Sequence, residues 1–170
     1  MIGFPKCGQT SLAEYLIKRL GGEFVADRAE IIWREDGLKQ FEENGYLENN
    51  YRPVIIIRDP IERIWSDWNH LGRGYGFATF EEYLANEKPI GGFGEYNPIK
   101  RSNYDKWIKQ WAKYNPIVLE LEQMMLNPNF KHRNKGEEHF EKYEPIPAHY
   151  KRLCEKLLER EILLSKNRGK

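Results

Sequence analysis

Residues 53–57, which read Pro-Val-Ile-Ile-Ile, constrain the fold of this chain more than any other stretch. The consecutive β-branched residues favour a strand. Continuous apolar character without alternation is typical of a parallel strand that is buried on both faces. Parallel strands are joined by crossover connections, which are usually helices. This stretch therefore predicts an α/β fold in which helices cover a mostly parallel sheet.

The rest of the chain alternates short apolar stretches with segments of helical periodicity. Strands or extended segments are predicted at residues 2–4, 23–25, 30–33, 53–57 and 117–121. Helices are predicted at residues 11–20, 38–43, 59–70, 79–86, 97–111 and 147–165, with a short one that ends near 127. This alternation predicts a three-layer α/β sandwich with a P-loop-like nucleotide-binding fold. A length of 170 residues suits one domain, residues 1–170.

Charge and composition exclude several kinds of partner. The 27 lysines and arginines against 26 acidic residues give a net charge of +1, so neither nucleic acid nor a membrane surface is expected to bind. The longest apolar runs are about five residues, so no membrane insertion is expected, and the chain as it stands is expected to be soluble and cytoplasmic. Two cysteines and four histidines lack the spacing of metal ligands, so no metal is expected. The oligomeric state stays open.

The opening segment "GFPKCGQTS" follows the first predicted strand and leads into a helix. Gly3, Gly8 and Thr10 keep the frame of the triphosphate-binding loop G-x-x-x-x-G-K-[ST]. However, Gln9 stands at the lysine position, and Lys6 lies three residues earlier. Backbone N–H groups at a helix N-terminus after a glycine turn favour a phosphate ligand. The alternative is an ordinary strand-to-helix turn, which prefers the same residue types.

A second candidate site lies in "IIIRDPIERIWSDW", where Arg58 ends the buried strand and Ser66 follows eight residues later. Ligands of open parallel sheets bind at the carboxyl ends of the strands, so this arginine and the opening loop are expected to share one crevice. A guanidinium and a hydroxyl suit a phosphate monoester. The alternative is that Arg58 pairs with a nearby acid and Ser66 faces solvent. For Arg63, which lies between them, a structural role and a contact with an acid both stay open.

Together these segments resemble the sulfotransferases that use 3′-phosphoadenosine 5′-phosphosulfate (PAPS). "GFPKCGQTSL" is similar to their 5′-phosphosulfate loop, and "RDPIERIWSDW" to their 3′-phosphate motif with the same interval between arginine and serine. The resemblance continues to about residue 128 and is strongest to the carbohydrate and tyrosylprotein branches. It implies transfer of a sulfuryl group from PAPS to an acceptor hydroxyl without a metal. A carbohydrate is the first choice of acceptor, and a tyrosine or a small alcohol is the second.

The resemblance also implies a role for each matching residue. Lys6 matches the lysine that stabilises the leaving 5′-phosphate. Arg58 and Ser66 match the ligands of the 3′-phosphate. The residues implied to hold the 5′-phosphate are Lys6, Cys7, Gly8, Gln9, Thr10 and Ser11, of which Gln9 departs from the usual threonine. The basic residues of a loop implied to close over the nucleotide are Lys131, Arg133 and Lys135.

The acceptor hydroxyl needs a general base, and Glu30 is the first choice. In the resembling branches the base lies 20 to 30 residues after the loop lysine, and Glu30 follows Lys6 by twenty-four residues. Its apolar neighbours disfavour the charged form of its carboxylate, which suits proton abstraction near neutral pH. Asp27 and Glu35 are alternatives. His70 matches a segment that is structural or lines the substrate site in the family.

Two other classes of function compete with the sulfotransferase interpretation. A nucleotide kinase or other nucleotide triphosphatase is disfavoured by Gln9 and by the lack of an acidic strand end for magnesium. A non-catalytic nucleotide-binding module would keep the crevice but not the transfer. Tyr104, Trp107 and Trp111 are predicted to lie in the core because of their helical spacing. Trp33 or Trp65 is a candidate to stack on adenine or to line the acceptor site.

Overall fold

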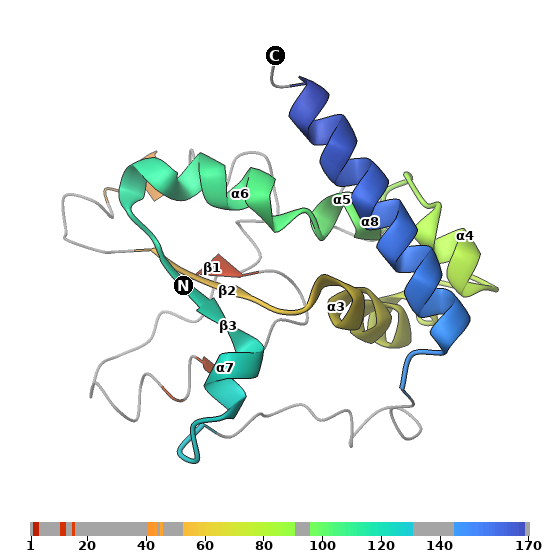
Figure 1. Ribbon diagram of the computed structural model, residues 1–170, viewed down its shortest axis with the longest axis horizontal. Coiled ribbons are helices and arrows are strands. Elements are labelled where there is room, and N and C mark those ends of the chain that lie inside the picture. The colour runs from red at the N-terminus through yellow and green to blue at the C-terminus, as the bar shows by residue number, and fades with distance from the viewer. Residues whose placement is uncertain are drawn as a thin grey trace. The chain divides into compact units, whose positions relative to one another are not determined.

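The computed structural model describes residues 2–3, 11–12, 15, 41–43, 45, 53–90, 96–130 and 145–168 (Figure 1). The chain divides into two compact units. Unit 1 consists of residues 1–58 and 107–135, and unit 2 consists of residues 59–106 and 136–170. Each unit is described by itself, and the single domain expected over residues 1–170 stays a prediction.

Unit 1 is built on a parallel sheet whose described strands are β1 (Ile2–Gly3), β2 (Val54–Ile57) and β3 (Ile117–Glu120), in the order β1-β2-β3 (Figure 1). Ile2 pairs with Ile55, and Val54 pairs with Ile117. Strand β3 leads directly into the short helix α7 (Leu121–Met125). A mixed α/β class with parallel strands is therefore confirmed. The extended segments expected at 23–25 and 30–33 lie outside the described residues.

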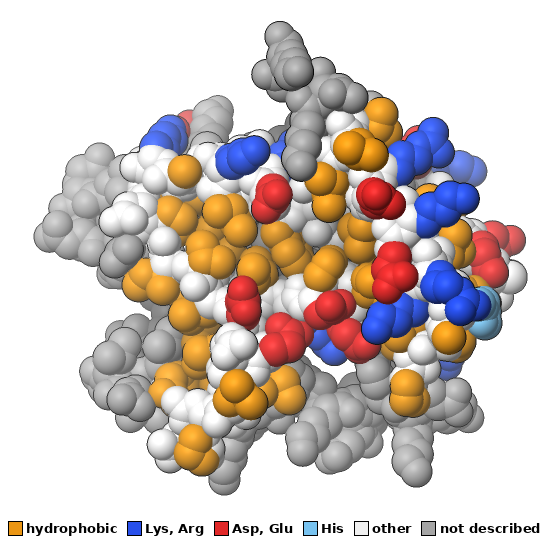
Figure 2. All heavy atoms as spheres, viewed as in Figure 1, with side chains coloured by type: hydrophobic (Ala, Val, Ile, Leu, Met, Phe, Trp, Pro, Cys, Tyr) orange, Lys and Arg blue, Asp and Glu red, His pale blue; other side chains and the backbone are white. Residues whose placement is uncertain are grey.

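The central strand β2 is covered on both faces, as its apolar run predicts. Ile55 and Ile56 point to opposite faces of the sheet, and both are fully buried. In β3, by contrast, Ile117 and Val118 are more than one third exposed. Figure 2 shows apolar side chains gathered over β3 and α7. The burial of the sheet therefore decreases from β2 to β3.

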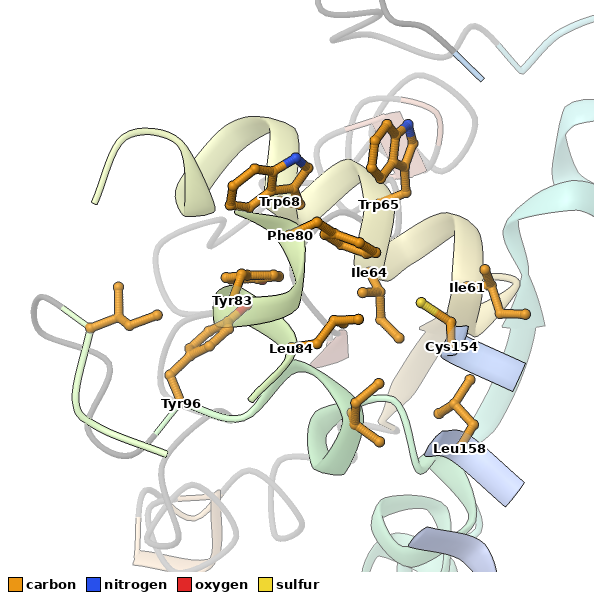
Figure 3. Packing of buried hydrophobic residues seen from close by; sticks show 12 residues of the cluster. Ile61, Ile64, Trp65, Trp68, Phe80, Tyr83, Leu84, Tyr96, Cys154 and Leu158 are labelled. Atoms are coloured by element: carbon orange, nitrogen blue, oxygen red, sulfur yellow. The ribbon is translucent and has the colours of Figure 1, made fainter. Parts of the chain in front are cut away.

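Unit 2 is helical in its described part. Its elements are α3 (Pro60–Asp67), the π-helix η2 (Trp68–Gly72), α4 (Phe80–Leu84), α5 (Pro98–Arg101) and α8 (Ala148–Arg168). An aromatic core joins these helices: Phe80 lies between Trp65 and Trp68, with ring centroids 5.2 and 5.8 Å away (Figure 3). Cys154 and Leu158 of α8 complete this core. Burial raises the pKa of the Cys154 thiol to about 12, so the thiol stays protonated at neutral pH.

Helices α3 and α4 begin where their capping residues predict. The Asp59 carboxylate accepts hydrogen bonds from the backbone N–H groups of Ile61 and Glu62, both at 2.9 Å. The Thr79 hydroxyl accepts one from the N–H of Glu82 at 3.2 Å. These bonds satisfy donors that the first turn of a helix leaves without helical partners. The helix expected from 59 is therefore confirmed, although it changes to a π-helix after Asp67.

The π-helix brings Gly72 under the ring of Trp68. A Cβ atom built on Gly72 would lie 2.2 Å from Cε3 of Trp68. Gly72→Ala is therefore expected to lower the free energy of unfolding by about 1 to 3 kcal/mol, because Trp68 must leave its place in the core. Denaturant unfolding followed by tryptophan fluorescence measures the loss of stability, and the fluorescence of the native protein reports the changed environment of Trp68.

The matched control for Gly72→Ala is Gly76→Ala. A Cβ atom on Gly76 meets no atom within 4 Å, but the residue has a φ of +80°. Its substitution is expected to cost about 1 to 2 kcal/mol through backbone strain, and to leave the native fluorescence unchanged. A Gly72→Ala protein with wild-type stability and fluorescence would contradict the role assigned to Gly72.

The single helix expected over residues 97–111 is wrong, because the structure divides it into α5 and α6 (Tyr104–Trp111). In a continuous helix the carbonyl of Pro98 would accept a hydrogen bond from the N–H of Ser102. It instead accepts from Nη2 of Arg63 at 2.7 Å and from the Ser102 hydroxyl at 2.8 Å. The Ser102 N–H turns to the carbonyl of Ile99 at 3.0 Å. A tertiary contact therefore ends α5.

The aromatic stripe of α6 behaves largely as expected for a core face. Tyr104 and Trp111 are buried, which confirms two of the three predicted positions, and Trp107 is half-buried. Trp111 packs against Phe41 with ring centroids 5.2 Å apart. Because Phe41 is helical, this contact also supports the helix predicted over residues 38–43.

Candidate functional site

The carboxyl edge of the sheet in unit 1 is where the sequence predicts a phosphate site. Strands β1 and β2 run parallel, with Gly3 paired to Ile56, so the carboxyl ends of both strands lie at the same edge of the sheet. Arg58 comes directly after β2, two residues beyond Ile56. The position of Arg58 at the carboxyl end of a parallel strand is therefore as predicted.

Arg58 has an acidic neighbour in the structure. Its side chain is 18 % exposed, and its Nε lies 3.9 Å from Oε1 of Glu122, whose side chain is 48 % exposed. A pair that is this long and this exposed contributes little free energy. The alternative in which Arg58 pairs with a nearby acid is thus observed.

Ser11 is the described member of the predicted 5′-phosphate loop. It is helical and buried, as is Leu12. The same helical segment contacts the region after α7, where the Asn127 amide donates to the Tyr15 hydroxyl at 3.0 Å. The Tyr15 ring meets Phe130 edge-on with centroids 5.7 Å apart. The described residues 11, 12 and 15 are helical, as the helix predicted over residues 11–20 requires. The contacts of Tyr15 hold this segment against residues 127–130 within unit 1.

Most other predicted site residues lie outside the described residues and stay predictions. They are Lys6, Cys7, Gly8, Gln9, Thr10, Asp27, Glu30, Glu35, Lys131, Arg133 and Lys135.

Ser66 lies on the partly exposed side of α3 in unit 2. Glu62, one turn earlier in α3, is also partly exposed. In η2, which continues α3, Asn69 is partly exposed and His70 is exposed. Among the residues that the structure describes, none accepts a hydrogen bond from the Ser66 hydroxyl. Ser66 is therefore accessible to a ligand from the solvent side of α3.

The adjacent, buried side of α3 carries an ionic network that begins at Arg63. The Arg63 side chain is fully buried. Its Nε and Nη2 donate to the Ser102 hydroxyl at 3.1 and 2.6 Å, Nη2 donates to the Pro98 carbonyl, and Nη1 donates to Oδ2 of Asp67 at 3.2 Å. Both interpretations left open for Arg63 are thus correct, because it has a structural role and contacts an acid.

Asp67 is the centre of this network. Its fully buried Oδ2 also accepts hydrogen bonds from the hydroxyls of Tyr83, at 2.8 Å, and Tyr96. Burial, and then the Asp67 charge, raise the pKa of Tyr83, so this hydroxyl stays protonated as a donor. The guanidinium of Arg101 lies 4.2 Å from the centre of the Tyr96 ring. Burial, and then the neighbouring charge of Arg63, lower the pKa of Arg101 to about 10, so Arg101 stays charged at neutral pH.

We call this set the α3 network; its members are Arg63, Asp67, Tyr83, Tyr96, Ser102 and the Pro98 carbonyl. The sequence analysis did not single out Asp67, Tyr83, Tyr96 or Ser102. One local signal was present, because Arg63 and Asp67 are separated by four residues and so share one face of α3. Figure 3 shows Tyr83 and Tyr96 beside one another in the core of unit 2.

The structure also describes two further candidates from the sequence, Trp65 and His70. Trp65 is buried against Phe80 and Tyr150, so it belongs to the core of unit 2. The other stacking candidate, Trp33, lies outside the described residues. His70 is exposed within the π-helix.

No protein-family model matches the chain, and no solved structure matches it. Over the described residues, no group of three or more potential metal-ligating side chains is present. The described helices include none with the length and apolar character needed to span a bilayer.

Proposed function

We propose that this chain is a PAPS-dependent sulfotransferase with a three-layer, P-loop-like α/β fold. The observation that carries the proposal is the presence of two separate PAPS-type motifs in the family order, with Arg58 at the carboxyl end of a buried parallel strand. The first motif follows β1, whose carboxyl end lies at the same edge of the sheet. Nucleotides bind at this edge in open parallel sheets.

In the proposed reaction the acceptor oxygen attacks the sulfur atom of PAPS. The bond between sulfur and the bridging oxygen breaks, and its electron pair passes to the 5′-phosphate. Lys6 stabilises the charge that develops on this oxygen, as an oxyanion hole does. Glu30 takes the proton from the acceptor hydroxyl. The products are a sulfate ester and adenosine 3′,5′-bisphosphate, and a sugar hydroxyl is the first choice of acceptor.

Gln9 is the residue that separates this proposal from a nucleotide kinase. A kinase of the P-loop type needs lysine at that position to contact the terminal phosphates, together with a magnesium ion. Sulfuryl transfer involves no third phosphate, so a lysine earlier in the loop suits it better. Ser66 and Arg58 are proposed to bind the 3′-phosphate, which ATP lacks.

Calorimetric titration of the full chain tests the proposal. Adenosine 3′,5′-bisphosphate is expected to bind without metal, and more tightly than ATP with magnesium. Tight binding of ATP with magnesium and none of the bisphosphate would disprove the sulfotransferase proposal.

Arg58→Ala is expected to weaken the binding of adenosine 3′,5′-bisphosphate by about tenfold to a hundredfold, because a charge-assisted hydrogen bond contributes about 1.5 to 3 kcal/mol. The same titration measures this loss. Arg152→Ala, which removes an exposed arginine of α8, is the matched control and should bind as the wild type does. Equal affinities of the Arg58→Ala and wild-type proteins would remove Arg58 from the site.

A further inference from the structure

Ser66 and the α3 network occupy adjacent positions on one short helix. Ser66 directly precedes Asp67 and follows Arg63 by three residues, so it lies roughly 60° around the helix from Arg63. The direction of the Ser66 hydroxyl therefore depends on the rotation of α3 about its own axis. An interaction that fixes Arg63 and Asp67 fixes this rotation.

The α3 network ties α3 to three other segments of unit 2. Tyr83 belongs to α4, Ser102 and Pro98 to α5 and its end, and Tyr96 to the segment before α5. The fork of the guanidinium contacts Ser102 and Pro98, which fixes its orientation as well as its position. Apolar packing alone lacks such directional restraint.

A buried ion pair is also an unusual way to stabilise a helix in a small core. Replacing such a pair with well-packed apolar residues is often neutral or stabilising, because burial of charge costs desolvation free energy. Arg63 and Asp67 are both fully buried in a unit that is otherwise rich in aromatic packing. Stability alone therefore does not account for this network, and its directional hydrogen bonds favour a role in orienting α3.

We propose that the α3 network is a positioning device that aims the Ser66 hydroxyl at the 3′-phosphate of the nucleotide. The inference rests on the proposed function. Arg63, Asp67, Tyr83 and Tyr96 are positioning residues, and they act on the ligand only through Ser66.

The test measures the 3′-phosphate increment, which is the ratio of the dissociation constant for adenosine 5′-monophosphate to that for adenosine 3′,5′-bisphosphate. Tyr96→Phe removes one hydroxyl from Asp67 but keeps the ring under Arg101. It also leaves Oδ2 of Asp67 with the donors Arg63 and Tyr83. We expect the increment to fall about three- to tenfold, the value of one hydrogen bond. The affinity for the monophosphate should not change.

The control for this variant is Tyr150→Phe, which removes a hydroxyl in the same unit that donates to the exposed Glu81 at 3.4 Å and lies outside the α3 network. Its increment should equal that of the wild type. Ser66→Ala provides the decisive comparison. If the α3 network acts through Ser66, Tyr96→Phe should have no further effect on the increment once Ser66 is alanine. If Tyr96→Phe does not fold, as judged by circular dichroism, Tyr83→Phe takes its place.

The inference would be overturned by an unchanged increment in Tyr96→Phe, by an equal loss of affinity for both nucleotides, or by additive effects of the two substitutions. In each of these cases a wild-type protein that still prefers the bisphosphate leaves the proposed function intact. A wild-type protein that binds both nucleotides equally overturns the inference and the proposed function together.

Discussion

Asp67→Ala is expected to lower the free energy of unfolding by about 3 to 5 kcal/mol, because it leaves the guanidinium of Arg63 buried without its carboxylate. Arg63 and Asp67 are both fully buried, with Nη1 and Oδ2 at 3.2 Å. The hydroxyls of Tyr83 and Tyr96 also lose their shared acceptor. Few single substitutions have so large an effect.

Denaturant unfolding followed by circular dichroism measures this loss. Asp105→Ala, at an exposed position in the first turn of α6, is the matched control and should change the stability by no more than about 0.5 kcal/mol. Asp67→Asn should give an intermediate loss, because the amide keeps an acceptor oxygen but not the charge. A loss below about 1 kcal/mol in Asp67→Ala would contradict the buried pairing of Arg63 with Asp67.

Lys6→Ala is expected to lower turnover by about a hundredfold to a thousandfold, the effect of removing one group that stabilises developing charge. Its affinity for PAPS should change far less than its turnover, because the charge on the bridging oxygen develops only in the transition state. Steady-state rates and calorimetry on the same preparation measure both quantities. Turnover at the wild-type rate would exclude Lys6 as the leaving-group residue.

Glu30→Ala is the companion to this experiment. If Glu30 is the general base, its substitution should also lower turnover, and the loss should diminish at high pH as the acceptor hydroxyl ionises without help. Unchanged turnover would leave Lys6 in place and assign the base to Asp27 or Glu35.

Local sequence patterns predicted much of the secondary structure. The β-branched run of β2 predicted a strand buried on both faces, because the burial of consecutive residues requires cover on both sides. Asp59 and Thr79 predicted the beginnings of α3 and α4, since a capping side chain acts on residues two or three positions away. The break between α5 and α6 was not predictable in this way. It depends on Arg63, which is 35 residues from Pro98 in sequence.

The candidate site shows the same division between local and distant interactions. The place of Arg58 at a strand end follows from the strand that precedes it. The partners of Asp67 do not follow from local pattern, because Tyr83 and Tyr96 are 16 and 29 residues away. Tyrosines in an aromatic-rich segment resemble ordinary core residues, and only the folded chain shows that their hydroxyls share one carboxylate. The i, i+4 pair of Arg63 and Asp67 was the sole local sign of this network among the described residues.

Transfer of radiolabelled sulfur from PAPS to an acceptor tests the central claim most directly. The full chain is incubated with labelled PAPS and a panel of sugars, tyrosine peptides and small alcohols, with the Lys6→Ala protein as the control. The proposed sulfotransferase should release adenosine 3′,5′-bisphosphate and place the label on an acceptor, preferably a sugar, and Lys6→Ala should do so about a hundredfold to a thousandfold more slowly. Binding of the bisphosphate without label on any member of the panel would contradict transfer and identify the chain as a nucleotide-binding module.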